Sequence, residues 1–358
     1  MIDDHHHMKS AIALARRGLG RCAPNPSVGC VIVKDGHVIA RAVTAPGGRP
    51  HAEMQALMQA GGQAKGADVY VTLEPCAHVG ETPSCAEELV KAGVKRVYIA
   101  VQDPDPRTNG QGIEKLRAGG VEVTADFLKD EAMETLRGFL LSKTQARPEI
   151  TLKSACTIDG KVALSNGASK WITGAQARRF AHLERAMHDA TVCGIGTVLI
   201  DDPSLTTRLA GVKSGAPRIV FDTDLRLPTD SKVLSNIDAQ PLWIVCGEKA
   251  DDTIARKLEE KGVIILKEND LPTALSKIAS RGVMRLLVEG GPTLLSSFLR
   301  SGFWDRWLVF RAGAEIGTDG AGMTGPAHLT DMADLQRLKR TDIRVLGEDL
   351  LEIYEKPA

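Results

Sequence analysis

The segment from His51 to Cys85 constrains the first half of the chain more than any other feature of the sequence. It contains the imidazole of His51 and the thiols of Cys76 and Cys85, and these ligand types suit zinc. Residues 52–60 favour a helix and residues 68–74 a buried strand, while an S-x-x-E capping box predicts a second helix that begins near Cys85. A fold that binds zinc here must bring the ends of these elements together.

The order of these residues indicates a hydrolytic site. His51, Cys76 and Cys85 supply three ligands and leave a fourth position for water, whose pKa zinc lowers towards neutrality. Glu53 is not needed as a ligand, so it can carry protons. H-x-E followed by P-C is the signature of zinc-dependent nucleobase deaminases. The two cysteines are nine positions apart, a wider spacing than in that signature, which argues against an ordinary cytidine or transfer-RNA deaminase.

Two other interpretations of this segment remain open. A cysteine taken alone is more often a small buried hydrophobic residue than a ligand. The zinc site could also be structural and closed, in which case His78 would be the fourth ligand. The proton-carrying Glu53 beside the first ligand favours a site that is open to water.

The length of the chain indicates two domains. At 358 residues it exceeds the usual single domain. A helix predicted over residues 130–145 ends in the helix-breaking sequence A-R-P. We therefore place one domain over residues 1–146 and a second over residues 147–358.

The charge and cysteine content restrict the partners and the compartment. The 45 basic residues balance the 45 acidic ones, so neither nucleic acid nor an anionic membrane is expected as a partner. Seven scattered cysteines form no disulfide framework, and no apolar signal or membrane-spanning run is present, so we expect a cytoplasmic protein. The histidines at 5–7 are interpreted as part of a mobile terminus.

The first half predicts alternating helices and strands beyond the zinc segment. An amphipathic helix over residues 8–18 leads to a strand hairpin, and a further strand follows over residues 95–103. This alternation is typical of a mixed sheet covered by helices. Asn25 stands between two prolines, where it either serves in a turn or reads the edge of a pyrimidine.

The second half also predicts an α/β domain. Strands are expected over residues 149–163, 191–202, 217–224 and 241–248, with a helix over 176–190. Further along the chain, helical and strand patterns continue to alternate.

A glycine turn in the second half is a candidate anion site. Glu289 ends a predicted strand, Gly290 and Gly291 follow, and Pro292 starts a helix. Bare N–H groups at such a helix start can bind a phosphate, although Gly-Gly after a strand is also a plain turn. In the other glycine run, G-I-G-T-V-L, Leu199 stands where a G-x-G-x-x-G fingerprint needs a small residue, so a classical dinucleotide fold is not expected.

These motifs resemble the bifunctional riboflavin-biosynthesis deaminase–reductase family. PNPSVGCVIV, HAE, YVTLEPCAHVGETPSC and QDPDP resemble its deaminase half, and KSACTIDGKVA, SKWITG, GIGTVLIDDPSLTTR and VEGGPTLL resemble its reductase half in the same order. The resemblance covers roughly residues 8–310. It implies an N-terminal cytidine-deaminase-like three-layer α/β/α domain and a C-terminal dihydrofolate-reductase-like α/β domain.

The resemblance also implies two successive reactions on one pyrimidine nucleotide. Zinc-dependent hydrolysis would remove an amino group from the ring of 2,5-diamino-6-ribosylamino-4(3H)-pyrimidinone 5′-phosphate. NADPH would then reduce the ribosyl chain to ribityl, and we expect a homo-oligomer, either a dimer or a tetramer. Three alternatives are kept: an enzyme with only one of the activities, a deaminase for another base joined to an unrelated reductase, and a zinc-stabilised binding module without catalysis, which Glu53 disfavours.

The resemblance carries over to individual positions. It assigns zinc to His51, Cys76 and Cys85 and proton transfer to Glu53. The residues that would line NADPH are Ala155, Trp171, Thr197, Asp201, Thr223, Gly291, Pro292, Thr293, Leu294, Leu295, Ser296 and Ser297. The residues that would contact the substrate are Lys153, Ser169, Arg185, Leu205, Arg208 and Glu289, and Asn25 is added to them from its place between two prolines. Arg208 has an independent physical reason, since a guanidinium group binds a phosphate through two parallel hydrogen bonds.

Two positions depart from the family pattern. Glu81 stands between the cysteines where the family usually has a basic residue, and Thr44 stands where it usually has a histidine. Glu81 would repel a phosphate. Arg49 or Arg107 is a candidate for the missing positive charge.

Overall fold

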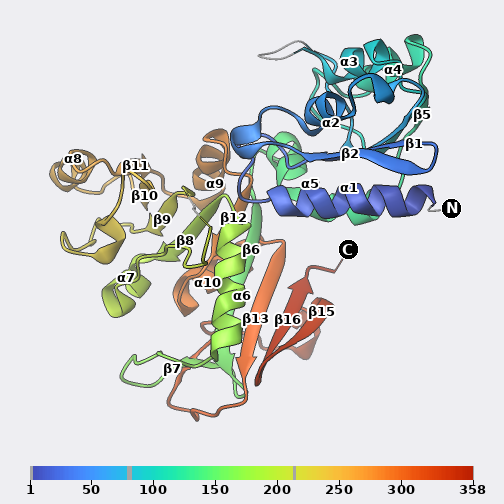
Figure 1. The fold of residues 1–358 in the computed structure, drawn as a ribbon. Coiled ribbons are helices and arrows are strands. Elements are labelled where there is room, and N and C mark those ends of the chain that lie inside the picture. Colours follow the sequence, from blue (N-terminus) through green and yellow to red (C-terminus); the bar gives the residue numbers. More distant parts are fainter. Residues whose placement is uncertain (1–2, 79–82, 213–214, 358) are drawn as a thin grey trace. The chain divides into compact units, whose positions relative to one another are not determined.

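The computed structural model describes residues 3–78, 83–212 and 215–357, which fall into two compact units (Figure 1). The first unit comprises Met1–Arg147 and Ala279–Met284, and the second comprises Pro148–Ile278 and Arg285–Ala358. Each unit has its own sheet and its own helices.

The first unit is built on a five-stranded sheet with the order β2-β1-β3-β4-β5. The strands are β1 (Gly29–Lys34), β2 (His37–Val43), β3 (Asp68–Leu73), β4 (Arg96–Val101) and β5 (Glu122–Thr124). β1 pairs with β2 and β3 in antiparallel fashion, whereas β3, β4 and β5 are parallel. The inner strands are runs of valine, isoleucine and tyrosine that are buried on both faces, as a sheet covered by helices requires.

Helices cover both faces of this sheet (Figure 1). The helices are α1 (Asp4–Gly18), α2 (Ala52–Ala60), α3 (Cys85–Lys91), α4 (Gln111–Ala118) and α5 (Lys129–Thr144), with short 3-10 helices at Pro46–Gly48 and Gly61–Ala64. α1 packs with α5 on one face, and α2, α3 and α4 pack together on the other. The predicted three-layer α/β/α domain is therefore confirmed.

The N-terminal histidines belong to the fold, so the expectation of a mobile terminus is wrong. α1 begins at Asp4, and the side chain of Asp3 accepts a hydrogen bond from the backbone N–H of His6. The Asp4 carboxylate accepts hydrogen bonds from the hydroxyls of Tyr70 (2.5 Å) and Tyr98 (2.9 Å), two rings that stack 4.7 Å apart. These partners are far from Asp4 in the sequence, and no local pattern indicates them.

The second unit is built on a nine-stranded sheet with the order β11-β10-β9-β8-β12-β6-β13-β16-β15. The strands are β6 (Glu149–Thr157), β8 (Ala190–Gly194), β9 (Arg218–Phe221), β10 (Leu242–Cys246), β11 (Ile264–Lys267), β12 (Arg285–Val288), β13 (Arg306–Ala312), β15 (Lys339–Leu346) and β16 (Asp349–Glu355). In this order, the first seven strands, from β11 at the edge to β13, are parallel to one another. β16 and β15 then extend the sheet in antiparallel fashion. A small separate sheet pairs β7 (Lys161–Ala163) with β14 (Ala321–Gly322).

Helices connect the parallel strands of the second unit, as the alternating pattern predicts (Figure 1). They are α6 (Ala175–Ala186), α7 (Ile195–Asp201), α8 (Asp252–Glu259), α9 (Leu271–Ser280) and α10 (Pro292–Ser301), with short 3-10 helices at Lys232–Leu234 and Met332–Asp334. Among the described residues, no helix is both long enough and apolar enough to cross a bilayer.

Two strand predictions in this unit are wrong in part. β8 ends at Gly194, and the residues predicted to continue it form α7. Ile195 and Val198 are buried whereas Leu199 is exposed, which is the three-residue periodicity of a helix. The predicted strand over 149–163 is likewise two strands, β6 and β7, separated by a turn. In the first case an apolar run does not by itself distinguish a long strand from a strand followed by a helix. In the second case Asp159 and Gly160 are a turn signal inside the predicted strand, and Gly160 has a φ of 76°.

We expect Asp4→Ala to lower the stability of the first unit by about 1–2 kcal/mol, because two tyrosine hydroxyls lose a charged acceptor. The hydrogen bond from Tyr70 lowers the pKa of Asp4. This contribution is therefore present above the usual aspartate pKa of about 4 and is lost as the pH falls through the lowered value. Thermal unfolding followed by circular dichroism at several pH values measures it.

Lys9→Ala is the matched control, because Lys9 is exposed on the same helix. It should leave the unfolding midpoint nearly unchanged. If both variants lower the midpoint equally, the tyrosine–aspartate contacts do not stabilise the unit.

Candidate active sites

Three side chains from separate elements of the first unit converge on a metal site. His51 immediately precedes α2, Cys76 follows β3 and Cys85 is the first residue of α3. The Nδ1 atom of His51 lies 3.7 Å from the sulfur of Cys76 and 3.4 Å from that of Cys85. In a tetrahedral zinc site with ordinary bond lengths, the nitrogen–sulfur separation is about 3.6 Å. The donor set therefore fits zinc.

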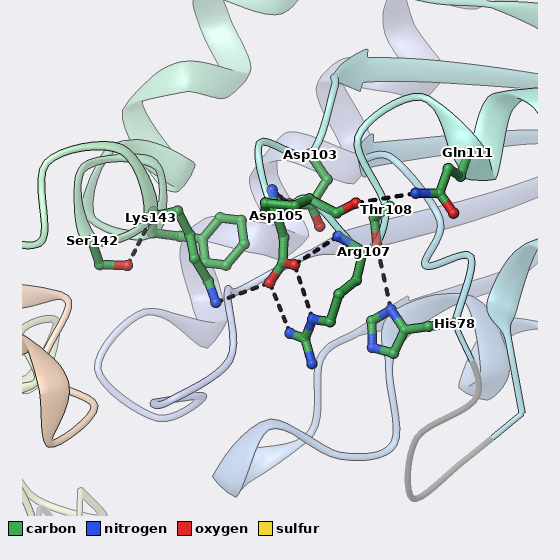
Figure 2. Close-up of polar contacts among 10 residues, drawn as sticks. His78, Asp103, Asp105, Arg107, Thr108, Gln111, Ser142 and Lys143 are labelled. Atoms are coloured by element: carbon green, nitrogen blue, oxygen red, sulfur yellow. Dashed lines mark hydrogen bonds and ion pairs between the residues drawn. The ribbon is translucent and has the colours of Figure 1, made fainter.

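The ligand group consists of three residues within the described part of the chain. His78, the candidate fourth ligand, lies apart from it, because its Nδ1 faces the hydroxyl of Thr108 at 3.5 Å (Figure 2). A site with three protein ligands keeps a position for water, which is the arrangement of catalytic zinc.

Glu53 lies in the first turn of α2 and is 3% exposed. Burial raises the pKa of its carboxyl to about 7, and the nearby His51 opposes this rise. The carboxylate also accepts a hydrogen bond from the thiol of Cys85. Glu53 therefore faces the ligand group, as a group that moves protons at the metal must.

Of the two ligand cysteines, Cys76 is held in an arrangement that stabilises its thiolate, whereas the hydrogen bond with Cys76 and burial raise the pKa of Cys85. The hydrogen bond from Cys85 lowers the pKa of Cys76 to about 4. The backbone N–H of Cys85, at the start of α3, also donates to the Cys76 sulfur at 3.3 Å. A helix N-terminus favours negative charge, so α3 prepares Cys76 to bind a cation.

Glu74 is a further important residue of this region that the sequence reasoning missed. It is 2% exposed, and its carboxylate accepts from the backbone N–H groups of Asp103, Gly110, Gly112 and Ile113 at 2.9–3.2 Å. It thereby fixes the loop after β4 and the start of α4 next to the strand end that carries Cys76. The sequence signal that could have indicated Glu74 is an acidic residue placed directly after an apolar strand.

The loop after β4 carries a cluster of charges (Figure 2). Asp105 accepts from Arg107 at 2.8 and 2.9 Å and from Lys143 of α5 at 3.0 Å. Burial raises the pKa of the neighbouring Asp103 to about 6. Arg107, a candidate for the missing positive charge, is thus already paired with a carboxylate.

The other positions of interest in this unit differ in accessibility. Asn25 is half-buried and donates from Nδ2 to the carbonyl of Gly48 at 3.2 Å. Thr44 is 2% exposed, and its hydroxyl accepts from the backbone N–H of Val28, so this position serves the fold. Glu81 lies outside the described residues.

In the second unit, a buried carboxylate at the end of β12 gathers two cations. Arg185 of α6 binds Glu289 through two hydrogen bonds of 2.5 and 2.9 Å, and the Lys153 ammonium lies 3.8 Å from the same carboxylate. Burial alone would raise the pKa of Glu289, but the two cations lower it to about 2. Burial lowers the pKa of Lys153.

α6 also holds the loop that carries Arg208. Arg185 donates to the carbonyl of Thr206 at 2.9 Å. One turn earlier, His182 contacts Arg208 through both ring nitrogens. His182 is absent from the predicted site residues. The predicted Leu205 is 3% exposed and packs in a hydrophobic cluster, so only its backbone can reach a ligand.

The predicted cofactor residues gather mainly at the ends of β8 and β12. The hydroxyl of Thr197 in α7 accepts from the backbone N–H of Gly291 at 3.1 Å, which joins the two glycine turns. Gly291 caps α10 without a side-chain hydrogen bond, so its first-turn N–H groups have no capping side chain. Leu295 and Ser296 are buried, and Ser296 accepts from the backbone of Gly325.

The remaining predicted positions are distributed around this edge of the sheet. Asp201, at the end of α7, accepts from Ser169 at 3.1 Å. Trp171 is 65% exposed, with the Arg178 guanidinium 4.7 Å from its ring centre. Thr223 follows β9 and its carbonyl accepts from Gly247. Ala155 lies in β6, and the other predicted cofactor positions, Pro292, Thr293, Leu294 and Ser297, belong to α10.

Both units match known families. The cytidine and deoxycytidylate deaminase zinc-binding region matches residues 1–101, and the RibD C-terminal domain matches residues 148–351. The riboflavin biosynthesis protein RibD of Aquifex aeolicus is 41% identical to the chain over 99% of the chain and 98% of that protein. The Escherichia coli protein of the same name is 35% identical to the chain, and the match covers 98% of the chain and 98% of that protein.

Solved structures give the same result. RibD of Acinetobacter baumannii is 38% identical and superimposes with a TM-score of 0.90, with 98% of each chain covered. A diaminohydroxyphosphoribosylaminopyrimidine deaminase/5-amino-6-(5-phosphoribosylamino)uracil reductase from Thermotoga maritima is 32% identical, with a TM-score of 0.88 and coverage of 99% and 98%. The likeness extends over both units and not over one domain alone.

We expect the purified chain to bind about one zinc ion through three protein ligands. Cys76→Ser should lose most of this zinc, because a hydroxyl is a far weaker ligand than a thiolate. His78→Ala is the control and should retain it. Elemental analysis of unchelated preparations measures the zinc content. Zinc loss in the His78 variant would make the site a closed structural one.

Proposed function

Because the chain belongs to the RibD family of bifunctional riboflavin-biosynthesis enzymes, we propose that its two sites act in succession on one pyrimidine nucleotide. The chain is a deaminase and a reductase, and its cofactors are zinc and NADPH. The alternative of a non-catalytic binding module is thereby set aside. The observation that supports the succession most directly is a zinc-ligand group with an adjacent buried Glu53 in the same chain as a reductase domain.

In the deaminase site, His51, Cys76 and Cys85 hold the metal. Zinc, when bound, lowers the pKa of water so that hydroxide is available near neutral pH. Glu53 accepts the proton that this water gives up and returns it to the departing amino group, so that ammonia leaves and a carbonyl replaces the amine. The burial of Glu53 keeps this transfer away from bulk water.

Asn25 is the proposed reader of the pyrimidine. Its Nδ2 group is used by the carbonyl of Gly48, which leaves its side-chain oxygen to accept from a ring amino group. Arg107, whose side chain is largely exposed, is the proposed source of attraction for the substrate phosphate in place of the family's usual basic residue, and Asp103 and Asp105 on the same loop oppose it.

In the reductase site, the first turn of α10 binds the cofactor's phosphates. Thr197 fixes Gly291, and the N–H groups that follow are free to donate to an anion. NADPH, when bound, would supply a hydride to C1′ of the ribosyl group, and the C1′–O4′ bond of the sugar ring breaks. Lys153, buried beside Glu289, is placed to give the proton that O4′ takes up, which forms a hydroxyl of the ribityl chain. Ser169, Arg185, Leu205 and Glu289 would hold the sugar, and Arg208 the phosphate.

We also propose a cytoplasmic homo-oligomer. All seven cysteines are free thiols, which suits a reducing compartment. β15 is the edge strand of its sheet and exposes Ile343 (51%) and Val345 (75%). These are two exposed apolar side chains on an otherwise mostly charged strand, and a second copy would cover them. Light scattering of Val345→Lys should then show a smaller species than the unsubstituted protein.

The direct test is incubation with the diaminopyrimidine nucleotide. Without NADPH the reaction should stop at the deaminated ribosyl compound, and with NADPH it should continue to the ribityl compound. Glu53→Gln should lower deamination by at least about a hundredfold, the usual scale of general acid–base catalysis. Reduction of the deaminated compound should be unchanged. Normal deamination by this variant would refute the role of Glu53.

Gly291→Val should weaken NADPH binding by about tenfold or more, because the side chain blocks phosphate from backbone donors. A Cβ atom at Gly291 would meet only the Thr197 hydroxyl, at an ordinary 3.5 Å, so the variant should fold. Arg208→Ala should raise the KM for the nucleotide about tenfold and leave cofactor affinity intact. NADPH fluorescence titration measures both variants. Loss of the cofactor by the Arg208 variant would reverse the assignment.

A further inference from the structure

His182 and Arg208 make an unusual double contact. His182 lies on α6, one turn before Arg185, and Arg208 lies on the loop that follows α7. The backbone N–H of Arg208 points to Nδ1 of His182 at 3.3 Å, and its side-chain Nε–H points to Nε2 at 3.3 Å. Both ring nitrogens therefore face a donor.

A neutral imidazole cannot satisfy two donors at once. One of its nitrogens accepts, whereas the other carries a hydrogen and donates. Whichever tautomer is present, one N–H of Arg208 faces another N–H. The contact thus contains an excess of donors over acceptors.

The position of the backbone decides which nitrogen accepts. The Arg208 backbone is restrained, because the same loop is tied to Arg185 through the carbonyl of Thr206. The Arg208 side chain is exposed and can move. The conflict is relieved most easily when Nδ1 accepts from the backbone and the Nε2–H group faces the guanidinium.

The surroundings keep the ring neutral. Burial, reinforced by the charges of Arg185 and Arg208, lowers the pKa of His182 to about 4, against an opposing effect of Glu289. Lys153 adds a further positive charge nearby. Glu289 is the carboxylate that faces this group, and it is already bound by Arg185 through two hydrogen bonds. The net charge around His182 is positive and attracts an anion.

We propose that His182 donates its Nε2–H to the same phosphate that Arg208 binds. An oxygen placed between the two N–H groups accepts from both and removes the donor conflict. The proposal rests on the proposed function, since it gives the nucleotide's phosphate a second, uncharged donor. His182 thereby discriminates phosphorylated from unphosphorylated substrate and holds the Arg208 loop in position.

The test compares the deaminated nucleotide with the same compound lacking its phosphate, using the full zinc-loaded chain and NADPH. His182→Phe keeps a planar ring and removes the donor. It should raise the KM for the nucleotide roughly tenfold to a hundredfold, the scale of a hydrogen bond to a charged group. The KM for the unphosphorylated compound should change less than about twofold, and inorganic phosphate should inhibit the variant more weakly.

His182→Gln restores an N–H donor at a similar reach, so it should recover most of the phosphate preference. Arg179→Ala is the matched control, because Arg179 is exposed on the same helix. An equal rise in KM for both compounds would mean that His182 only supports the loop, and the proposal would fall. A glutamine variant as impaired as the phenylalanine variant would also overturn it.

The proposed function and the role of His182 are tested by different outcomes. If the unsubstituted chain does not reduce the deaminated nucleotide with NADPH, the proposed function is wrong. If it does, and the phosphate preference survives in His182→Phe, only the role of His182 is wrong. NADPH titration of each variant shows whether the domain is folded.

Discussion

The structure depends on the parallel arrangement of strands, which brings their carboxyl ends to one edge of each sheet. In the first unit this edge carries the end of β3 with Glu74 and Cys76, and the end of β4 with Asp103. In the second unit it carries the glycine turns after β8 and β12. Side chains that are distant in the sequence meet there, and helix N-termini with bare N–H groups begin there.

Each unit places a buried carboxylate at this edge, and each neutralises it differently. The Glu74 carboxylate accepts hydrogen bonds from four backbone N–H groups, so it stabilises a loop without needing a cation beside it. Glu289 is held by Arg185 and faces Lys153, so it stays ionised within a group of cations. An unpaired buried carboxylate would be strongly destabilising. The first arrangement suits a fixed scaffold for metal ligands, and the second keeps one anion and two cations together at the edge of the reductase sheet.

Chemical identity and local periodicity made much of the protein predictable. The pattern of His51, Cys76 and Cys85 indicated a zinc site because few chemistries need these groups together, and these three residues do converge. The layers of the first unit followed from alternating apolar runs. α7 was mistaken for strand because G-I-G-T-V-L-I is apolar in either conformation. The ordered start of α1 was not predicted because the residues that hold it, Tyr70 and Tyr98, lie on strands β3 and β4, far away in the sequence.

The sequence by itself determined the ligand types and the two-domain order, since these depend on which groups are present and in what succession. Only the tertiary structure decided that His78 turns away from the metal group towards Thr108, that Arg107 is paired with Asp105, and that His182 faces Arg208. These are distances between atoms of separate elements. They are set by how helices pack on sheets, and no spacing along the chain encodes them.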